Sequence, residues 1–188
     1  MKSILIALGV LILAALAVGG WLMGVRNDLV PQREAINGQW SQVDVVLQRR
    51  ADLIPNLVES VKGYAKQETQ IFTDIANARA SMGGARTPGE RIQANGQLDS
   101  ALARLLVVVE NYPQLKSNEN FLRLQDELSG TENRIAVERR KYNEVVQKYN
   151  TAIELFPANL VAGMFGFNRN DAYFKVEPAK REAPAVKF

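Results

Sequence analysis

The stretch Ile4–Val25 reads ILIALGVLILAALAVGGWLMGV and contains no charged side chain over its 22 residues. At a rise of about 1.5 Å per residue, a helix of this length matches the hydrocarbon core of a bilayer. Trp21 lies near its end, where an aromatic side chain suits the headgroup boundary. The stretch therefore predicts a transmembrane anchor at residues 1–26.

A cleaved secretory signal is the alternative interpretation, because Ala15-Leu16-Ala17 offers a small-residue cleavage site behind the positive charge of Lys2. The apolar run continues past Ala17 to Val25, beyond the point where a cleaved signal turns polar, and we favour a retained anchor. Its orientation stays open, because Lys2 and the α-amino group on one side are balanced by Arg26 and Arg33 on the other.

Beyond the anchor, apolar residues recur every three or four positions, which is the period of an amphipathic helix. From Asn37 to Met82 they predict one long helix. Pro55 lies inside it, and because proline lacks an N–H and clashes with the preceding turn, we expect a kink or break near Ala51–Ile54. Gly83-Gly84 and the turn formers after them predict a tight reversal of the chain.

Two further helices follow the same period. Thr87 is a suitable cap for the first, with Pro88 at its first position and Glu90 in its first turn. Ser117 or Asn118 caps the next, which closes at Phe156-Pro157. Residues 156–167 predict a short amphipathic helix, and no segment alternates with the period of a strand.

These elements predict an all-α fold. We expect an antiparallel, up-and-down bundle of three long helices and a short C-terminal one, standing on the N-terminal transmembrane helix. The bundle occupies residues 27–167. We expect residues 168–188 to form a C-terminal tail that is largely disordered, because Lys175–Phe188 are rich in Pro, Ala and charge. Tyr173 and Phe174 are expected anchors before the disorder begins.

The composition limits the kinds of catalytic and binding site that we expect. The chain has no histidine and no cysteine, so the commonest metal ligand, the usual general base and the thiol nucleophile are missing. The net charge of +3 is spread along the chain, whereas a nucleic-acid-binding protein concentrates positive charge on one face. We therefore expect no catalytic residue, no metal site, no cofactor and no nucleic-acid partner, and a protein that is not an enzyme.

Two polar stretches interrupt the apolar helix faces, around Arg50 and around Glu138. One interpretation is a polar ligand site between helices; the other, which we favour, is a set of paired polar groups that fixes the register of the helices. The candidate inter-helix network consists of Arg50, Asp52, Asn56, Glu132, Asn133 and Glu138.

Two segments are candidate interfaces. The anchor contains Gly20-x-x-x-Gly24, a spacing that lets transmembrane helices approach closely. Residues 156–167 either cover the bundle's own core, which we favour, or present an apolar surface to a partner. The candidate interface residues are Gly20, Gly24, Phe156, Leu160, Met164, Phe165 and Phe167.

Beyond these features, the sequence closely resembles the bacterial LemA family from residue 1 to about residue 174. The resemblance rests on the anchor and on several unusual strings, namely Trp40-Ser41-Gln42-Val43-Asp44, residues 49–58 (RRADLIPNLV), Gly63-Tyr64-Ala65, Glu132-Asn133-Arg134-Ile135, Tyr142-Asn143, Tyr149-Asn150, Phe156-Pro157 and Phe165-Gly166-Phe167.

The resemblance implies an antiparallel helical bundle on one N-terminal membrane segment, in the bacterial envelope, with no established catalytic activity. The family includes proteins associated with magnetosome membranes. Lipid-anchored relatives imply a bundle outside the cytoplasm, whereas a family description with the short N terminus outside implies the opposite, and we lean to an extracytoplasmic bundle.

We accordingly expect a single-pass protein of the bacterial inner membrane that acts as a scaffold or adaptor. Its partners are the lipid bilayer, further copies of itself and another membrane protein. The alternative is a ligand- or lipid-sensing module that uses the polar site between the helices.

Overall fold

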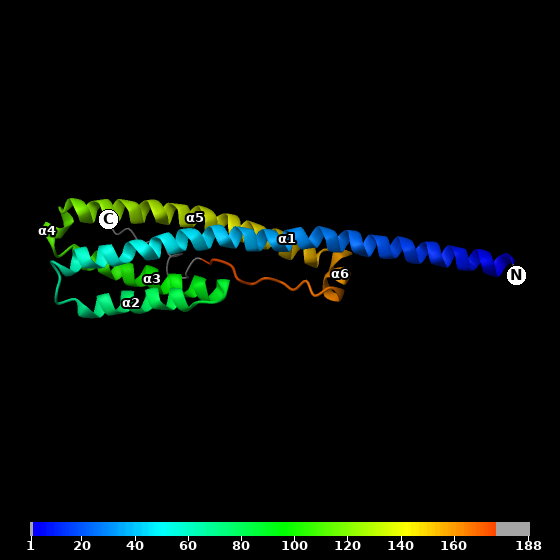
Figure 1. Ribbon diagram of the computed structural model, residues 1–188, viewed down its shortest axis with the longest axis horizontal. Helices are drawn as coiled ribbons and strands as arrows, with labels where there is room; N and C mark the ends of the chain where they lie inside the picture. The colour runs from blue at the N-terminus through cyan, green and yellow to red at the C-terminus, as the bar shows by residue number, and fades with distance from the viewer. Residues whose placement is uncertain (1, 176–188) are drawn as a thin grey trace, which may run out of the picture. The chain divides into compact units, whose positions relative to one another are not determined.

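The computed structural model describes residues 2–175, which are helical for most of their length and contain no strand (Figure 1). The predicted all-α class is therefore confirmed for this part of the chain. The helices are α1 (Lys2–Lys62), α2 (Thr69–Gly84), α3 (Pro88–Val109), α4 (Pro113–Lys116), α5 (Glu119–Glu154) and α6 (Ala158–Met164).

The described residues form two compact units. Unit 1 comprises residues 2–39 and 144–171, which are the first part of α1, the end of α5, and α6. Unit 2 comprises residues 40–143 and 172–175, which include the rest of α1 and α5 and the whole of α2, α3 and α4.

Unit 2 is an up-and-down bundle in which α1, α2, α3 and α5 follow one another in alternating directions (Figure 1). Each helix contributes the stripe of apolar residues that its period predicts. The largest fully buried side chains of this unit are Leu47, Ile54, Leu57, Ile75, Met82, Leu98, Leu105, Leu115, Phe121 and Tyr142. Burial of these side chains provides the main driving force for packing the helices.

The single helix expected from Asn37 to Met82 is wrong in one respect. α1 continues through Pro55 without a break and ends at Lys62, and α2 begins only at Thr69. The period does not reveal the turn because Ala65, within it, is buried like Val61 on the preceding helix. The amides of Tyr64 and Ala65 both donate to the carbonyl of Val61, at 3.0 and 2.9 Å, and close the end of α1.

The start of α3 has the predicted cap. The Glu90 amide donates to Thr87 Oγ1 at 3.2 Å, the Thr87 amide donates to Glu90 Oε2 at 3.3 Å, and Pro88 occupies the first turn. This reciprocal arrangement is a capping box. At the start of α5, Asn118 Oδ1 accepts from the amides of Asn120 and Phe121 at 3.0 and 3.1 Å, which confirms the second predicted cap.

Unit 1 holds the apolar run. Along α1 the residues from Ile4 to Val18 are exposed, and α1 contains a segment long and apolar enough to cross a membrane. The first fully buried side chain of α1 is Leu29, followed by Ile36. The other buried apolar side chains described in this unit are Val146, Tyr149, Ile153, Val161, Ala162 and Phe167.

The segment after α6 differs from the expected disordered tail. Residues 168–175 are extended and hydrogen-bonded to α5, because asparagine side chains of that helix bind their backbone groups. Phe174 is an anchor, as its aromatic character suggested. The remainder of the predicted tail, residues 176–188, lies outside the described residues.

Candidate functional site

The polar groups of unit 2 converge on Asp99 of α3. Arg50 of α1 is 7% exposed, and its Nη1 forms ion pairs with Asp99 and, at 3.0 Å, with Glu132 of α5. Asp99 Oδ2 lies 3.5 Å from Arg139 Nη2 of α5 and accepts a hydrogen bond from Asn95 Nδ2 at 3.0 Å. We call Arg50, Asn95, Asp99, Glu132 and Arg139 the Asp99 cluster, which joins three helices.

Only two members of the network expected from the sequence, Arg50 and Glu132, belong to this cluster. Asp52 is exposed and accepts from Gln48 of its own helix at 2.9 Å. Glu138 pairs with Lys141 at 2.8 Å. Asn56 and Asn133 are exposed. Asp52 and Asn56 follow Arg50 by two and six positions, so they point away from its side of α1.

Asp99, Asn95 and Arg139 were not predicted. A signal for the first two was present: Asn95 and Asp99 are four residues apart and flank Leu98 on the buried stripe of α3. A carboxylate and an amide within an apolar stripe require partners, because an unpaired buried polar group is costly. The sequence does not identify Arg139 as one of them, since that depends on how α3 and α5 align.

Two further arginines join the helices of unit 2. Arg91 of α3 forms an ion pair with Asp44 of α1 at 2.9 Å, donates to Gln48 Oε1 at 3.1 Å, and also donates to the carbonyl of Met82 in the last turn of α2. Arg79 Nε of α2 donates to the carbonyl of Ala51 at 3.1 Å. Arginine suits these positions because its planar group donates several hydrogen bonds in fixed directions.

Phe174 occupies an aromatic socket in unit 2. Its ring stacks on Trp40 with centroids 6.2 Å apart, meets Tyr142 edge-on at 5.9 Å, and lies 5.0 Å from the guanidinium carbon of Arg139. Asn143 binds both backbone groups of Phe174: Nδ2 donates to its carbonyl at 2.8 Å and Oδ1 accepts from its amide at 3.0 Å. The socket thus fixes one aromatic residue in an extended backbone.

An asparagine side chain of α5 also binds both backbone groups of one residue in unit 1, and we call each such arrangement an asparagine clamp. Asn150 Nδ2 donates to the carbonyl of Asn170 at 2.7 Å and Asn150 Oδ1 accepts from its amide at 2.9 Å. Tyr149 donates its hydroxyl to the carbonyl of Asn168 at 3.0 Å. Burial raises the pKa of Tyr149 above its usual value, and the positive charge of Arg33 opposes this shift.

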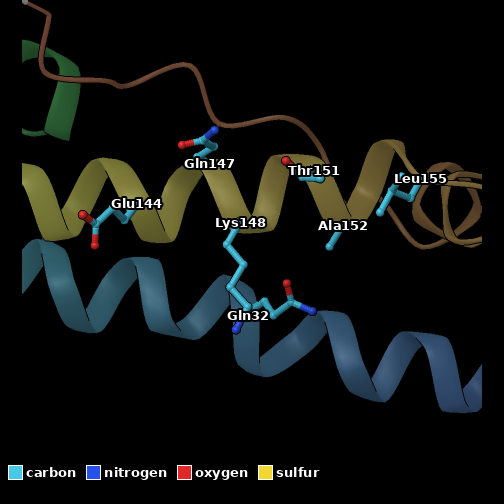
Figure 2. A pocket seen from close by; sticks show the side chains of 7 residues that line it. All are labelled: Gln32, Glu144, Gln147, Lys148, Thr151, Ala152 and Leu155. Atoms are coloured by element: carbon cyan, nitrogen blue, oxygen red, sulfur yellow. The ribbon is translucent and has the colours of Figure 1, made fainter.

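A shallow open depression lies on unit 1 between α1 and α5, as Figure 2 shows. In this view Lys148 extends from α5 towards Gln32 of α1. The lining residues are Gln32, Glu144, Gln147, Lys148, Thr151, Ala152 and Leu155.

The candidate interface residues divide into two groups. Gly20 and Gly24 are exposed on the anchor, and a Cβ added at either would meet no atom within 4 Å. Phe156, Leu160, Met164 and Phe165 are also exposed. Phe167 is buried beneath the guanidinium of Arg33, 5.1 Å from its ring centroid, so it belongs to the core of unit 1.

The described part of the chain contains no candidate metal site. Among residues 2–175, no group of three or more His, Cys, Asp or Glu side chains is placed to hold a metal ion.

The sequence matches the model of the LemA family over residues 39–188. Its relatives include the magnetosome protein MamQ 2 of Paramagnetospirillum magneticum, with 29% identity over 89% of this chain and 71% of the relative. MamQ of Magnetospirillum gryphiswaldense is 29% identical over 94% of this chain and 74% of the relative. Protein LemA of Metamycoplasma hominis is 26% identical over 74% of this chain and 64% of the relative. These matches confirm the resemblance inferred from the motifs.

Proposed function

Because this chain belongs to the LemA family, we propose that it acts as a non-enzymatic, membrane-anchored helical scaffold of the bacterial envelope. The apolar part of α1 supports a membrane protein. One observation carries the scaffold proposal: the charged groups that approach the core of unit 2 bind one another across helices, in the Asp99 cluster and through Arg91. Such pairing fixes the register of a bundle.

Membrane organisation is the process we assign to the scaffold. The support for this assignment is that two of the relatives above are named as magnetosome proteins. We extend to this chain a role in assembling membrane proteins or further copies of itself, without assigning it to a magnetosome.

Self-association through the anchor is the contact we propose first. Gly20 and Gly24 lie one turn apart on an exposed helix face, where two helix backbones can approach closely. The test is the mass of the full-length protein in a mild detergent or a native nanodisc. We expect a discrete assembly that dissociates in Gly20→Leu/Gly24→Leu and persists in Gly9→Leu, a matched change elsewhere on the anchor. A monomer without a co-purifying membrane protein contradicts the proposal.

We place the protein in the inner membrane with its bundle outside the cytoplasm. The chain contains no cysteine, so a single one introduced at exposed Gln147 reports the location of unit 1. A maleimide that does not cross membranes should label Gln147→Cys in spheroplasts before lysis. Labelling only after lysis contradicts this orientation.

The second candidate function is a ligand- or lipid-sensing module that uses the Asp99 cluster. The observation that favours it is unused hydrogen-bonding capacity: within the described residues, Arg50 Nε and Asn95 Oδ1 are buried without a hydrogen-bond partner. Vesicles of total bacterial lipid, added to detergent-solubilised protein, are the probe. A rise in melting temperature that is lost in Arg50→Met and kept in Arg49→Met, an exposed neighbour, supports the module; equal behaviour of the two variants rules it out.

A further inference from the structure

The position of the membrane boundary can be read along α1 in unit 1. The apolar run ends at Val25, and Arg26 is the first charged residue after it. Residues 4–18 of α1 are exposed, whereas Leu22 and Val25 are half-buried. The rest of unit 1 therefore begins to cover α1 within the last turn of the apolar run, at the level where a bilayer gives way to water.

The segment at this level includes the end of α6. The guanidinium of Arg26 lies 5.8 Å from the ring centroid of Phe165, the residue that follows α6. Arg33, two turns further along α1, lies over Phe167 at 5.1 Å. Figure 1 shows α6 lying across the direction of α1 rather than along it. A helix at the membrane boundary with this direction lies in the plane of the interface.

The two faces of α6 have different environments. Val161 and Ala162 are buried in unit 1. Leu160 and Met164, four residues apart on the other face, are 57% and 70% exposed, and Phe156 just before the helix is 80% exposed. Leu155 is exposed as well.

The sequence of this segment supports a lipid environment for the exposed face. Residues 155–165 (LFPANLVAGMF) contain no charged side chain. Exposed large apolar side chains without intervening charge are unfavourable in water. The same side chains are stabilised at the boundary between headgroups and acyl chains, where an interfacial helix buries its apolar face about 5–10 Å deep.

We propose that Phe156, Leu160 and Met164 form a membrane foot, a second contact with the bilayer that α1 crosses. Its occupant is lipid, because the foot is continuous with the transmembrane segment through the contact between Arg26 and Phe165. Because residues 155–165 contain no charged side chain, the contact of the foot itself depends on apolar burial more than on headgroup charge. This proposal does not depend on self-association.

The test uses single nitroxide labels, since the chain has no cysteine of its own. Full-length Leu160→Cys and Met164→Cys are labelled and placed, at one copy per disc, in nanodiscs of phosphatidylcholine with or without phosphatidylglycerol. We expect both labels to be readily reached by oxygen and several-fold less by a water-soluble nickel chelate, in both lipid mixtures. The matched control, Gln147→Cys on exposed α5, should show the opposite preference.

Three results would overturn the membrane foot. Labels at 160 and 164 that the nickel chelate reaches as readily as the label at 147 place the face in water. Labels that neither oxygen nor the nickel chelate reaches assign this face of α6 to a contact within the protein. Finally, Phe156→Ser/Leu160→Ser should expose a label at 164 to nickel while the helix content stays unchanged; continued protection contradicts the proposal. A monomer without a co-purifying membrane protein in the mass measurement, by contrast, contradicts the scaffold proposal and leaves the foot intact.

Discussion

Arg79 supplies the hydrogen bond that Pro55 withholds from Ala51. In a helix the carbonyl of Ala51 accepts from the amide four residues later, but residue 55 is proline and has no N–H. Arg79 Nε of α2 donates to this carbonyl at 3.1 Å. α1 continues through Pro55 to Lys62, and Ala51, about three turns before its end, is tied to α2.

This relationship predicts energetic coupling between positions 55 and 79. Arg79→Met should destabilise the protein by about 1–2 kcal/mol, because it leaves a partly buried carbonyl without a donor. In a Pro55→Ala background the amide of residue 55 restores that donor, so the same change should cost less than about 0.5 kcal/mol. Equilibrium unfolding of the four full-length proteins in detergent measures the coupling, and equal costs in both backgrounds would contradict it.

The Asp99 cluster predicts unequal effects for two adjacent arginines. Arg50→Met should lower the free energy of unfolding by about 2 kcal/mol. Asp99 then keeps Arg139 and Asn95 as partners, whereas Glu132 loses its ion pair with Arg50. Arg49→Met, on the exposed side of α1, should stay within about 0.5 kcal/mol of the parent protein. Unfolding by urea compares the two. A larger effect at Arg49 would show that the cluster does not fix the helices.

The socket of Phe174 makes a prediction about a single amide. Because the Phe174 N–H donates to Asn143 Oδ1, it should exchange slowly with solvent. Asn143→Ala should accelerate this exchange, whereas Asn143→Asp keeps an acceptor and should retain most of the protection. Asn133→Ala, at an exposed position of α5, is the control. Hydrogen exchange followed by NMR or mass spectrometry gives the result.

Two glycines near the end of α6 should respond to alanine with opposite signs. Gly166 has φ of +70°, a conformation that strains a residue with a side chain, so Gly166→Ala should cost about 1 kcal/mol. Gly163 lies within α6, where a Cβ would meet no atom within 4 Å. Gly163→Ala should therefore raise stability by up to about 0.5 kcal/mol. Thermal unfolding compares the two, and a shared sign would contradict the assignment of strain to Gly166.

The raised pKa of Tyr149 predicts a loss of stability at alkaline pH. The folded protein holds the phenol proton more tightly than the unfolded chain, whose tyrosine titrates near 10. The contribution is fully present below pH 10 and is lost as the pH rises through the folded-state pKa. The melting temperature of the parent protein should thus fall more steeply above pH 10 than that of Tyr149→Phe. Parallel curves would show that the hydroxyl is not held in unit 1.

The helical class, the caps at Thr87 and Asn118 and most buried stripes could be predicted because they depend on residues within one or two turns. The end of α1 at Lys62 could not, because the six-residue turn places Ala65 in the core and keeps the apolar spacing intact. A pattern that counts only apolar positions does not distinguish such a turn from a continuing helix.

The polar sites were harder to predict, for a physical reason. Arg50 at a core position requires a partner, and the sequence shows this. The identity of that partner, Asp99, depends on the alignment of α1 with α3, which non-local packing decides. Asn143 and Asn150 bind backbone groups, which every residue possesses. The side chains of residues 170–174 therefore contain no pattern from which these contacts could be predicted.

No linker separates the apolar run from the buried part of α1. The direction in which each face of the anchor points is therefore fixed relative to the rest of unit 1. Val25 and Leu29 lie four residues apart on one uninterrupted helix. One residue inserted at Asn27 would rotate Gly20 and Gly24 by about 100° around the axis relative to Leu29, whereas seven would nearly restore their direction and displace them by about 10 Å. A flexible tether would absorb either insertion. In this protein the continuous helix has no such tether. The direction in which Gly20 and Gly24 face within the bilayer is therefore set by how the buried part of α1 packs in unit 1.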